Sequence, residues 1–227
     1  QNYSSWTKTV TAPWVSATWT TTEYATSDTE ADAIAALQFL RGSNTPFLLW
    51  VNWNAIHAPF HYPPGISGTP SVTGAPEARA MAEFLDGSIG RVLAEVDWST
   101  TTVIFCGDNG SVAGTAPPGS GLPHAGWKGS VYEGGTRTPL LIAGAAVGWR
   151  GTSYELVNSV DLHATMHSLT IGTERSVGDG ISLLGHLMHG RLHARSIAFS
   201  EWFEPNGTPT PATKKESARD GRYALVR

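Results

Sequence analysis

Two stretches of the chain are apolar at nearly every position, and each is as long as a buried β-strand. They cover residues 47–53 and 102–106, and a shorter apolar run covers residues 140–142. A strand that is covered on both faces needs no alternating polar side chains, so these runs favour a parallel sheet between layers of helices. Residues 196–202 and 222–226 are predicted to form late strands.

Apolar side chains at intervals of three and four predict helices between the strands. The capping-box pattern of residues 27–30 predicts the start of a first helix, and Gly42 marks its end. The clearest periodicity covers residues 81–96, and a third helix is expected near residues 160–169, after a cap at Asn158.

This order of elements predicts an α/β fold with three α/β/α layers and a mostly parallel central sheet. The length of 227 residues suits one domain over residues 1–227, with irregular structure in residues 1–25 and late strands in residues 196–227. No strand-then-helix unit precedes the first helix. We therefore expect the N-terminal portion of the sheet to be lacking from this chain.

Composition excludes several classes of protein. The net charge of −4 provides no basic surface for nucleic acid, and no apolar run is long enough to span a membrane. The single cysteine, Cys106, excludes an internal disulfide and a cysteine-based zinc cluster, and its position in an apolar strand predicts a packed thiol. The sequence does not indicate an oligomeric state.

Polar residues follow the predicted strands at the edge where parallel sheets bind ligands. His57 follows the first apolar run, Asp108 and Asn109 follow the second, and Lys128 lies in a later glycine-rich loop. Acid and amide oxygens suit calcium or magnesium better than zinc. A cation, an imidazole and an ammonium group together suit an anion, as in sulfuryl or phosphoryl transfer, and His57 could protonate a leaving oxygen.

Each of these residues also has a purely structural interpretation. Asp108–Gly110 could be a simple turn, His57 a surface side chain, and Lys128 a solvated one. Calcium needs six to eight oxygen ligands, so two adjacent residues cannot complete its shell. The remaining ligands and the attacking group must come from elsewhere, since the chain has neither a Gly-x-Ser-x-Gly motif nor a P-loop.

Four segments, in this order, resemble the sulfatase family of the alkaline phosphatase-like superfamily. The segments are residues 46–59, 81–93, 102–110 and 128–139, and residues 160–165 and 220–223 fit later segments of the family. The resemblance begins near residue 24 and implies an alkaline phosphatase-like fold. It also implies that residues 60–76 and 111–126 form the walls of the substrate pocket.

The resemblance implies a role for each candidate residue. Asp108 and Asn109 would be ligands of Ca²⁺, with Mg²⁺ the less favoured ion, and His57 and Lys128 would contact the sulfate group and assist the leaving oxygen. The family's nucleophile is a formylglycine made within a Cys/Ser-x-Pro/Ala-x-Arg motif. Cys106 is followed by Gly-Asp-Asn and does not match, and the family's early pair of metal-binding aspartates is also absent.

The leading hypothesis is therefore the C-terminal part of a sulfatase catalytic domain. The intact protein would be a formylglycine-dependent sulfuric ester hydrolase that acts on a sulfate-ester small molecule or glycan, and the isolated chain would be inactive. The resemblance to a family whose members are typically exported implies a periplasmic or secreted location. Two alternatives remain: a phosphonate or phosphodiester hydrolase on the same scaffold, or a non-catalytic fragment or pseudoenzyme.

Overall fold

The computed structural model describes residues 3–12, 15–115, 126–205, 207, 210 and 212–227. The chain divides into two compact units. Unit 1 consists of Gln1–Val96 with Gly114–Pro118, and unit 2 consists of Asp97–Ala113 with Gly119–Arg227.

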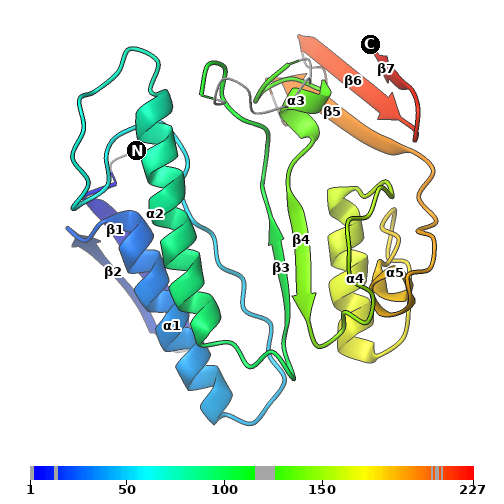
Figure 1. Ribbon diagram of the computed structural model, residues 1–227, viewed down its shortest axis with the longest axis horizontal. Coiled ribbons are helices and arrows are strands. Elements are labelled where there is room, and N and C mark those ends of the chain that lie inside the picture. The colour runs from blue at the N-terminus through cyan, green and yellow to red at the C-terminus, as the bar shows by residue number, and fades with distance from the viewer. Residues whose placement is uncertain (1–2, 13–14, 116–125, 206, 208–209, 211) are drawn as a thin grey trace. The chain divides into compact units, whose positions relative to one another are not determined.

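Unit 1 begins with a β-hairpin where irregular structure was predicted. Strands β1 (Trp6–Ala12) and β2 (Val15–Thr21) pair antiparallel, with Trp6 opposite Thr21 (Figure 1). Threonine, valine and tryptophan favour extended backbone, and the Thr9 and Thr18 hydroxyls bond across the ladder at 3.0 Å. Residues 1–25 were expected to be irregular, and the structure instead pairs two extended segments there, because β-branched threonines favour a partnered strand.

Two long helices, α1 (Ala25–Gly42) and α2 (Ala75–Ala94), lie side by side in unit 1 (Figure 1). Both helices were predicted, but α1 starts before the expected capping box. Its N-cap is Tyr24, and the Ala25 amide donates to the Tyr3 carbonyl oxygen at 2.7 Å in place of a side-chain cap. The helices are joined by Glu30, which accepts hydrogen bonds from Ser88 and from both Nε and Nη2 of Arg91.

The apolar run at residues 47–53 is extended but forms no ladder with any described residue. Leu49, Val51 and Trp53 pack against the core of α1 and α2, while Leu48 and Trp50 are exposed by 71% and 63%. The segment therefore has the alternating faces of a strand without the hydrogen bonds of one.

Unit 2 contains a two-stranded sheet of β3 (Thr102–Cys106) and β4 (Leu140–Gly144) and a three-stranded sheet of β5 (Ala198–Glu204), β6 (Thr213–Arg219) and β7 (Ala224–Val226). Every strand pair in the described residues is antiparallel, so the predicted mostly parallel sheet is not found there. An apolar run predicts that a strand is covered, but it does not identify the partner strand. Strand β6 was missed because lysine, glutamate and arginine occupy much of it.

The described part of unit 2 also contains the helices α3 (Glu133–Thr136), α4 (Ser159–Ile171) and α5 (Leu184–His189). Asn158 caps α4 as predicted, in a capping box whose second member is Asp161. Helices α3 and α5 are too short to have left a periodic signal in the sequence. Among the described helices, none has both the length and the apolar character needed to cross a membrane.

Candidate active site

His57 lies in unit 1, on the loop that follows the unpaired extended segment. The backbone of this loop is bound by Tyr3, whose hydroxyl lies 2.6 Å from the Asn54 carbonyl oxygen and 3.0 Å from the His57 carbonyl oxygen. The His57 amide donates to the same hydroxyl at 3.1 Å. One buried side chain thus fixes the peptide groups on both sides of the candidate catalytic histidine.

The His57 ring is oriented by its own loop. Its Nδ1 lies 2.9 Å from the carbonyl oxygen of Ala58, and because a carbonyl only accepts, Nδ1 must carry the proton. The side chain is exposed, and no described residue bonds to its Nε2. Nε2 is therefore the ring atom that is available to a substrate, as an acceptor or, when protonated, as a donor.

Asp108 and Asn109 follow β3 in unit 2, on a turn held against the loop that contains α3. The Gly107 amide donates to the Pro139 carbonyl oxygen at 3.1 Å, and the Gly110 amide donates to the Gly135 carbonyl oxygen at 2.9 Å. The backbones approach so closely at Gly110 that a Cβ atom there would collide with the Gly134 carbonyl group. Glycine is thus required at Gly110 to fix the position of the Asp108–Asn109 turn.

Lys128 is attached to the same turn by its backbone. Its amide donates to the Ser111 carbonyl oxygen at 2.8 Å, and its side chain is half-buried. Three backbone hydrogen bonds therefore connect the segment 107–111 with residues 128–139. Within unit 2 the structure brings together the loops of three predicted site residues, whereas His57 belongs to unit 1 and its convergence with them remains a prediction.

The donor chemistry of the turn fits part of a calcium site. Asp108 is exposed and forms no hydrogen bond or ion pair within the described part of the chain, so its carboxylate is available to a cation. However, no group of three histidine, cysteine or acidic side chains that could hold a metal ion occurs among the described residues. Asp108 and Asn109 match the oxygen donors that calcium prefers but can supply only part of its shell.

Cys106 was predicted to be packed, but its thiol is free and exposed, because neither face of the two-stranded ribbon is fully covered at the end of β3. The predicted pocket wall at residues 111–126 falls largely on residues 116–125, which lie outside the described part of the chain.

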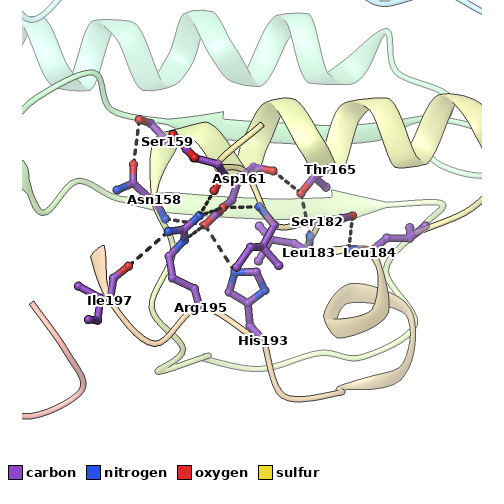
Figure 2. Close-up of polar contacts among 12 residues, drawn as sticks. Asn158, Ser159, Asp161, Thr165, Ser182, Leu183, Leu184, His193, Arg195 and Ile197 are labelled. Carbon is purple, nitrogen blue, oxygen red and sulfur yellow. Dashed lines mark hydrogen bonds and ion pairs between the residues drawn. The ribbon is translucent and has the colours of Figure 1, made fainter. Parts of the chain in front are cut away.

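The sequence interpretation missed a buried ion pair in unit 2. Asp161 is completely buried, and Arg195 donates to its two oxygens from Nε at 2.6 Å and from Nη2 at 2.5 Å (Figure 2). The Asn158 and Ile181 amides also donate to the carboxylate, each at 2.8 Å, and His193 Nε2 lies 3.5 Å from it. These contacts join the start of α4 to two later segments, so the network anchors the fold of unit 2.

The hydrogen bonds of Asp161 determine its charge state. Burial by itself would raise the pKa of the carboxyl group, but the Arg195 guanidinium and the Ile181 and Asn158 amides outweigh burial and hold the pKa below its usual value. Arg195 lies 34 positions away in the chain, so no local pattern could have revealed the pair.

Comparisons with known proteins agree with the resemblance found in the sequence. A family model described as Sulfatase matches residues 2–173. The uncharacterised sulfatase YdeN of Escherichia coli is 26% identical over 194 residues, which cover 78% of this chain and 34% of that protein. The steryl-sulfatase of Mus musculus is 34% identical over 118 residues, covering 48% of this chain and 18% of that protein.

Two further matches extend the comparison. Arylsulfatase G of Rattus norvegicus is 30% identical over 157 residues, which cover 59% of this chain and 28% of that protein. The solved structure of yidJ from Bacteroides fragilis, designated a candidate sulfatase, superposes with a TM-score of 0.72 at 16% identity, covering 92% of this chain and 50% of that chain. This likeness supports the predicted alkaline phosphatase-like fold. The chain spans about a third or less of these curated relatives and half of the solved structure.

Proposed function

Since this chain belongs to the sulfatase family, we propose that it forms part of the active site of a sulfuric ester hydrolase. The observation that carries the proposal is the set of backbone hydrogen bonds that joins the Asp108–Asn109 turn to the Lys128 loop. This contact brings a pair of oxygen donors for a cation close to an ammonium-bearing loop. A divalent cation and a lysine together suit the oxygens of a sulfate ester, which share one negative charge.

The proposed roles follow from the chemistry of each side chain. Asp108 and Asn109 would hold Ca²⁺, in preference to Mg²⁺, and the ion would supply positive charge to the sulfate oxygens. The Lys128 ammonium would bind and neutralise a sulfate oxygen. His57 would bind the same group through Nε2 or donate a proton from that atom to the leaving oxygen, while Nδ1 holds the ring in place.

We further propose that the sheet and the site are completed by another part of a longer polypeptide. The unpaired segment 47–53 and its exposed side chains Leu48 and Trp50 support this, because an extended apolar backbone without a ladder leaves its hydrogen-bonding groups open to a partner strand. The coverage of relatives agrees with it. That part would contribute a formylglycine nucleophile, the remaining calcium ligands and the strands of a mostly parallel sheet.

The substrate class follows from the same site. A sulfate monoester of a small molecule or a glycan would place its sulfate at Lys128 and His57. The names of the steryl-sulfatase and arylsulfatase relatives favour a hydrophobic or aromatic alcohol as the leaving group. We propose a periplasmic or secreted location on the family resemblance alone.

The test is a comparison of substrates and variants in the full-length polypeptide. We expect hydrolysis of an aryl sulfate to exceed that of an aryl phosphodiester, and Lys128→Ala and His57→Ala each to lower kcat/KM by about 100-fold. Lys215→Ala and His189→Ala change exposed residues outside the proposed site and serve as matched controls. A preference for the phosphodiester would favour the alternative hydrolase, and the absence of any turnover would favour a pseudoenzyme.

A further inference from the structure

Tyr3 links the core of unit 1 to the His57 loop. Only 4% of its surface is exposed, and it packs with Tyr24, Ala25 and Met81 in the core of unit 1. Its carbonyl oxygen accepts the Ala25 amide at the start of α1. Both the ring and the backbone of Tyr3 are therefore fixed to the helix that precedes the His57 loop.

Among the described residues, the hydroxyl group of Tyr3 forms hydrogen bonds only with the backbone of the His57 loop. It accepts from the His57 amide, and its single proton can go to the Asn54 carbonyl oxygen at 2.6 Å or to the His57 carbonyl oxygen at 3.0 Å. These contacts cross 51 and 54 positions of the sequence. Without this hydroxyl, the Asn54 carbonyl and the amide and carbonyl of His57 would lose the hydrogen bonds that tie them to the core of unit 1.

A second tyrosine binds the same loop at a different point. The Tyr24 hydroxyl lies 3.0 Å from Nε2 of His61, whose Nδ1 lies 2.8 Å from the Pro59 carbonyl oxygen. The ring of His61 in turn packs against the ring of Tyr3 at an interplanar angle of 50°, with 4.6 Å between the ring centroids. The loop is thus held by two tyrosine hydroxyls, that of Tyr3 at His57 and that of Tyr24 at His61. Each hydroxyl can be removed by its own substitution.

We infer that Tyr3 is a positioning residue for His57, which it acts on through the backbone without touching the substrate. The inference rests on the proposed function, in which His57 Nε2 faces the sulfate group. Because the His57 ring is oriented by the Ala58 carbonyl oxygen, fixing the peptide group of His57 also fixes the direction of Nε2. A displacement of about 1 Å at a catalytic group can lower a rate by about 100-fold.

The protonation of Tyr3 supports this role. Burial raises the pKa of the Tyr3 hydroxyl above its usual value, the hydrogen bond from the His57 backbone lowers it, and the neighbouring Tyr24 raises it further. The hydroxyl therefore keeps its proton at neutral pH and can donate and accept at the same time.

The test compares Tyr3→Phe with Tyr24→Phe in the full-length polypeptide. Both changes remove one hydroxyl from the same aromatic cluster, and the two side chains are similarly buried. We expect amide hydrogen exchange at His57 to become at least tenfold faster in Tyr3→Phe and to change less than threefold in Tyr24→Phe. We also expect kcat for an aryl sulfate to fall about tenfold in Tyr3→Phe, with KM nearly unchanged.

Hydrogen exchange in the unmodified protein provides a second measurement that does not depend on either variant folding. The His57 amide should exchange at least tenfold more slowly than the intrinsic rate of an unprotected amide, although its side chain is exposed. Exchange at the unprotected rate, or equal acceleration in both variants, would overturn the inference. If the protein hydrolyses no sulfate ester while the exchange results hold, the proposed function fails and the role of Tyr3 in positioning His57 stands.

Discussion

At the residue scale, the Asp108–Asn109 turn could be predicted from its sequence motif, whereas the distant backbone contacts that hold the turn in place could not. The motif predicted a turn at the end of β3, and β3 ends at Cys106, directly before it. The contact that fixes the turn involves Gly110 and Gly135, which are 25 positions apart and have no side chains to suggest a contact. Tyr3 and Arg195 were missed for the same reason, since each acts on a residue far away in the chain.

The close approach at Gly110 gives a prediction about the turn. Gly110→Ala would place a methyl group against the backbone of Gly134, so either the turn or the facing loop must move. We expect the free energy of unfolding to fall by about 1–3 kcal/mol. Urea unfolding followed by circular dichroism would measure it. Gly221→Ala, where a Cβ atom meets nothing within 4 Å, is the control and should change stability by less than about 0.5 kcal/mol.

The buried Asp161 gives a prediction about pH. Its pKa is lower in the folded state than in the unfolded chain, so near pH 4 the folded state binds fewer protons. Its contribution to stability is therefore complete above about pH 4 and is lost as the pH falls through the lowered pKa. Asp161→Asn should cost about 3 kcal/mol at neutral pH, because Arg195 is left buried without its partner.

Unfolding free energies measured between pH 7 and pH 2 test this prediction. The loss of stability on acidification should be smaller in Asp161→Asn than in the unmodified protein. Identical acid dependence in the two proteins would show that Asp161 does not carry a lowered pKa.

At the element scale, the long helices were predicted better than the pairing of the strands. The periodic spacing in α1, α2 and α4 reports a helix by itself, because helical hydrogen bonds are local. A strand depends on a partner that the sequence does not name, so β3 and β4 were located correctly but their antiparallel pairing was not predicted. Segment 47–53 shows this dependence most clearly. Its side chains alternate between buried and exposed as in a strand, but its backbone pairs with no strand among the described residues.

Leu48 tests whether a partner strand covers this segment in the full-length polypeptide. The side chain is 71% exposed here, and a surface leucine contributes little to stability. If a strand from another part of the polypeptide covers it, Leu48→Ala should lower the free energy of unfolding by about 2–5 kcal/mol. Val72→Ala, which changes a fully exposed loop residue, is the control. A change below about 0.5 kcal/mol for Leu48→Ala would contradict the proposed completion of the sheet.

At the scale of the whole molecule, the family was recognisable because four segments occur together in a fixed order. The match to the sulfatase model over residues 2–173 confirms that interpretation. The sequence did not reveal that the proposed site residues fall into two separate compact units. His57 belongs to unit 1, and Asp108, Asn109 and Lys128 belong to unit 2.

The proposed site is incomplete in this sequence, which gives a prediction about activity. The 227 residues alone should hydrolyse an aryl sulfate no faster than buffer, because the proposed nucleophile and most of the proposed calcium ligands are not in this sequence. A purified sample of these residues, assayed with added Ca²⁺, tests this. Turnover by the isolated chain that depends on Lys128 would show that the site is complete without any further segment.

The most direct measurement is a crystal structure of the full-length polypeptide grown with Ca²⁺ and inorganic sulfate. We expect a calcium ion at about 2.3–2.6 Å from oxygens of Asp108 and Asn109. We also expect a sulfate ion within hydrogen-bond distance of Lys128 Nζ and His57 Nε2. A calcium ion bound elsewhere, or His57 and Lys128 directed away from the Asp108 carboxylate, would contradict the proposal that these loops form one sulfate-cleaving site.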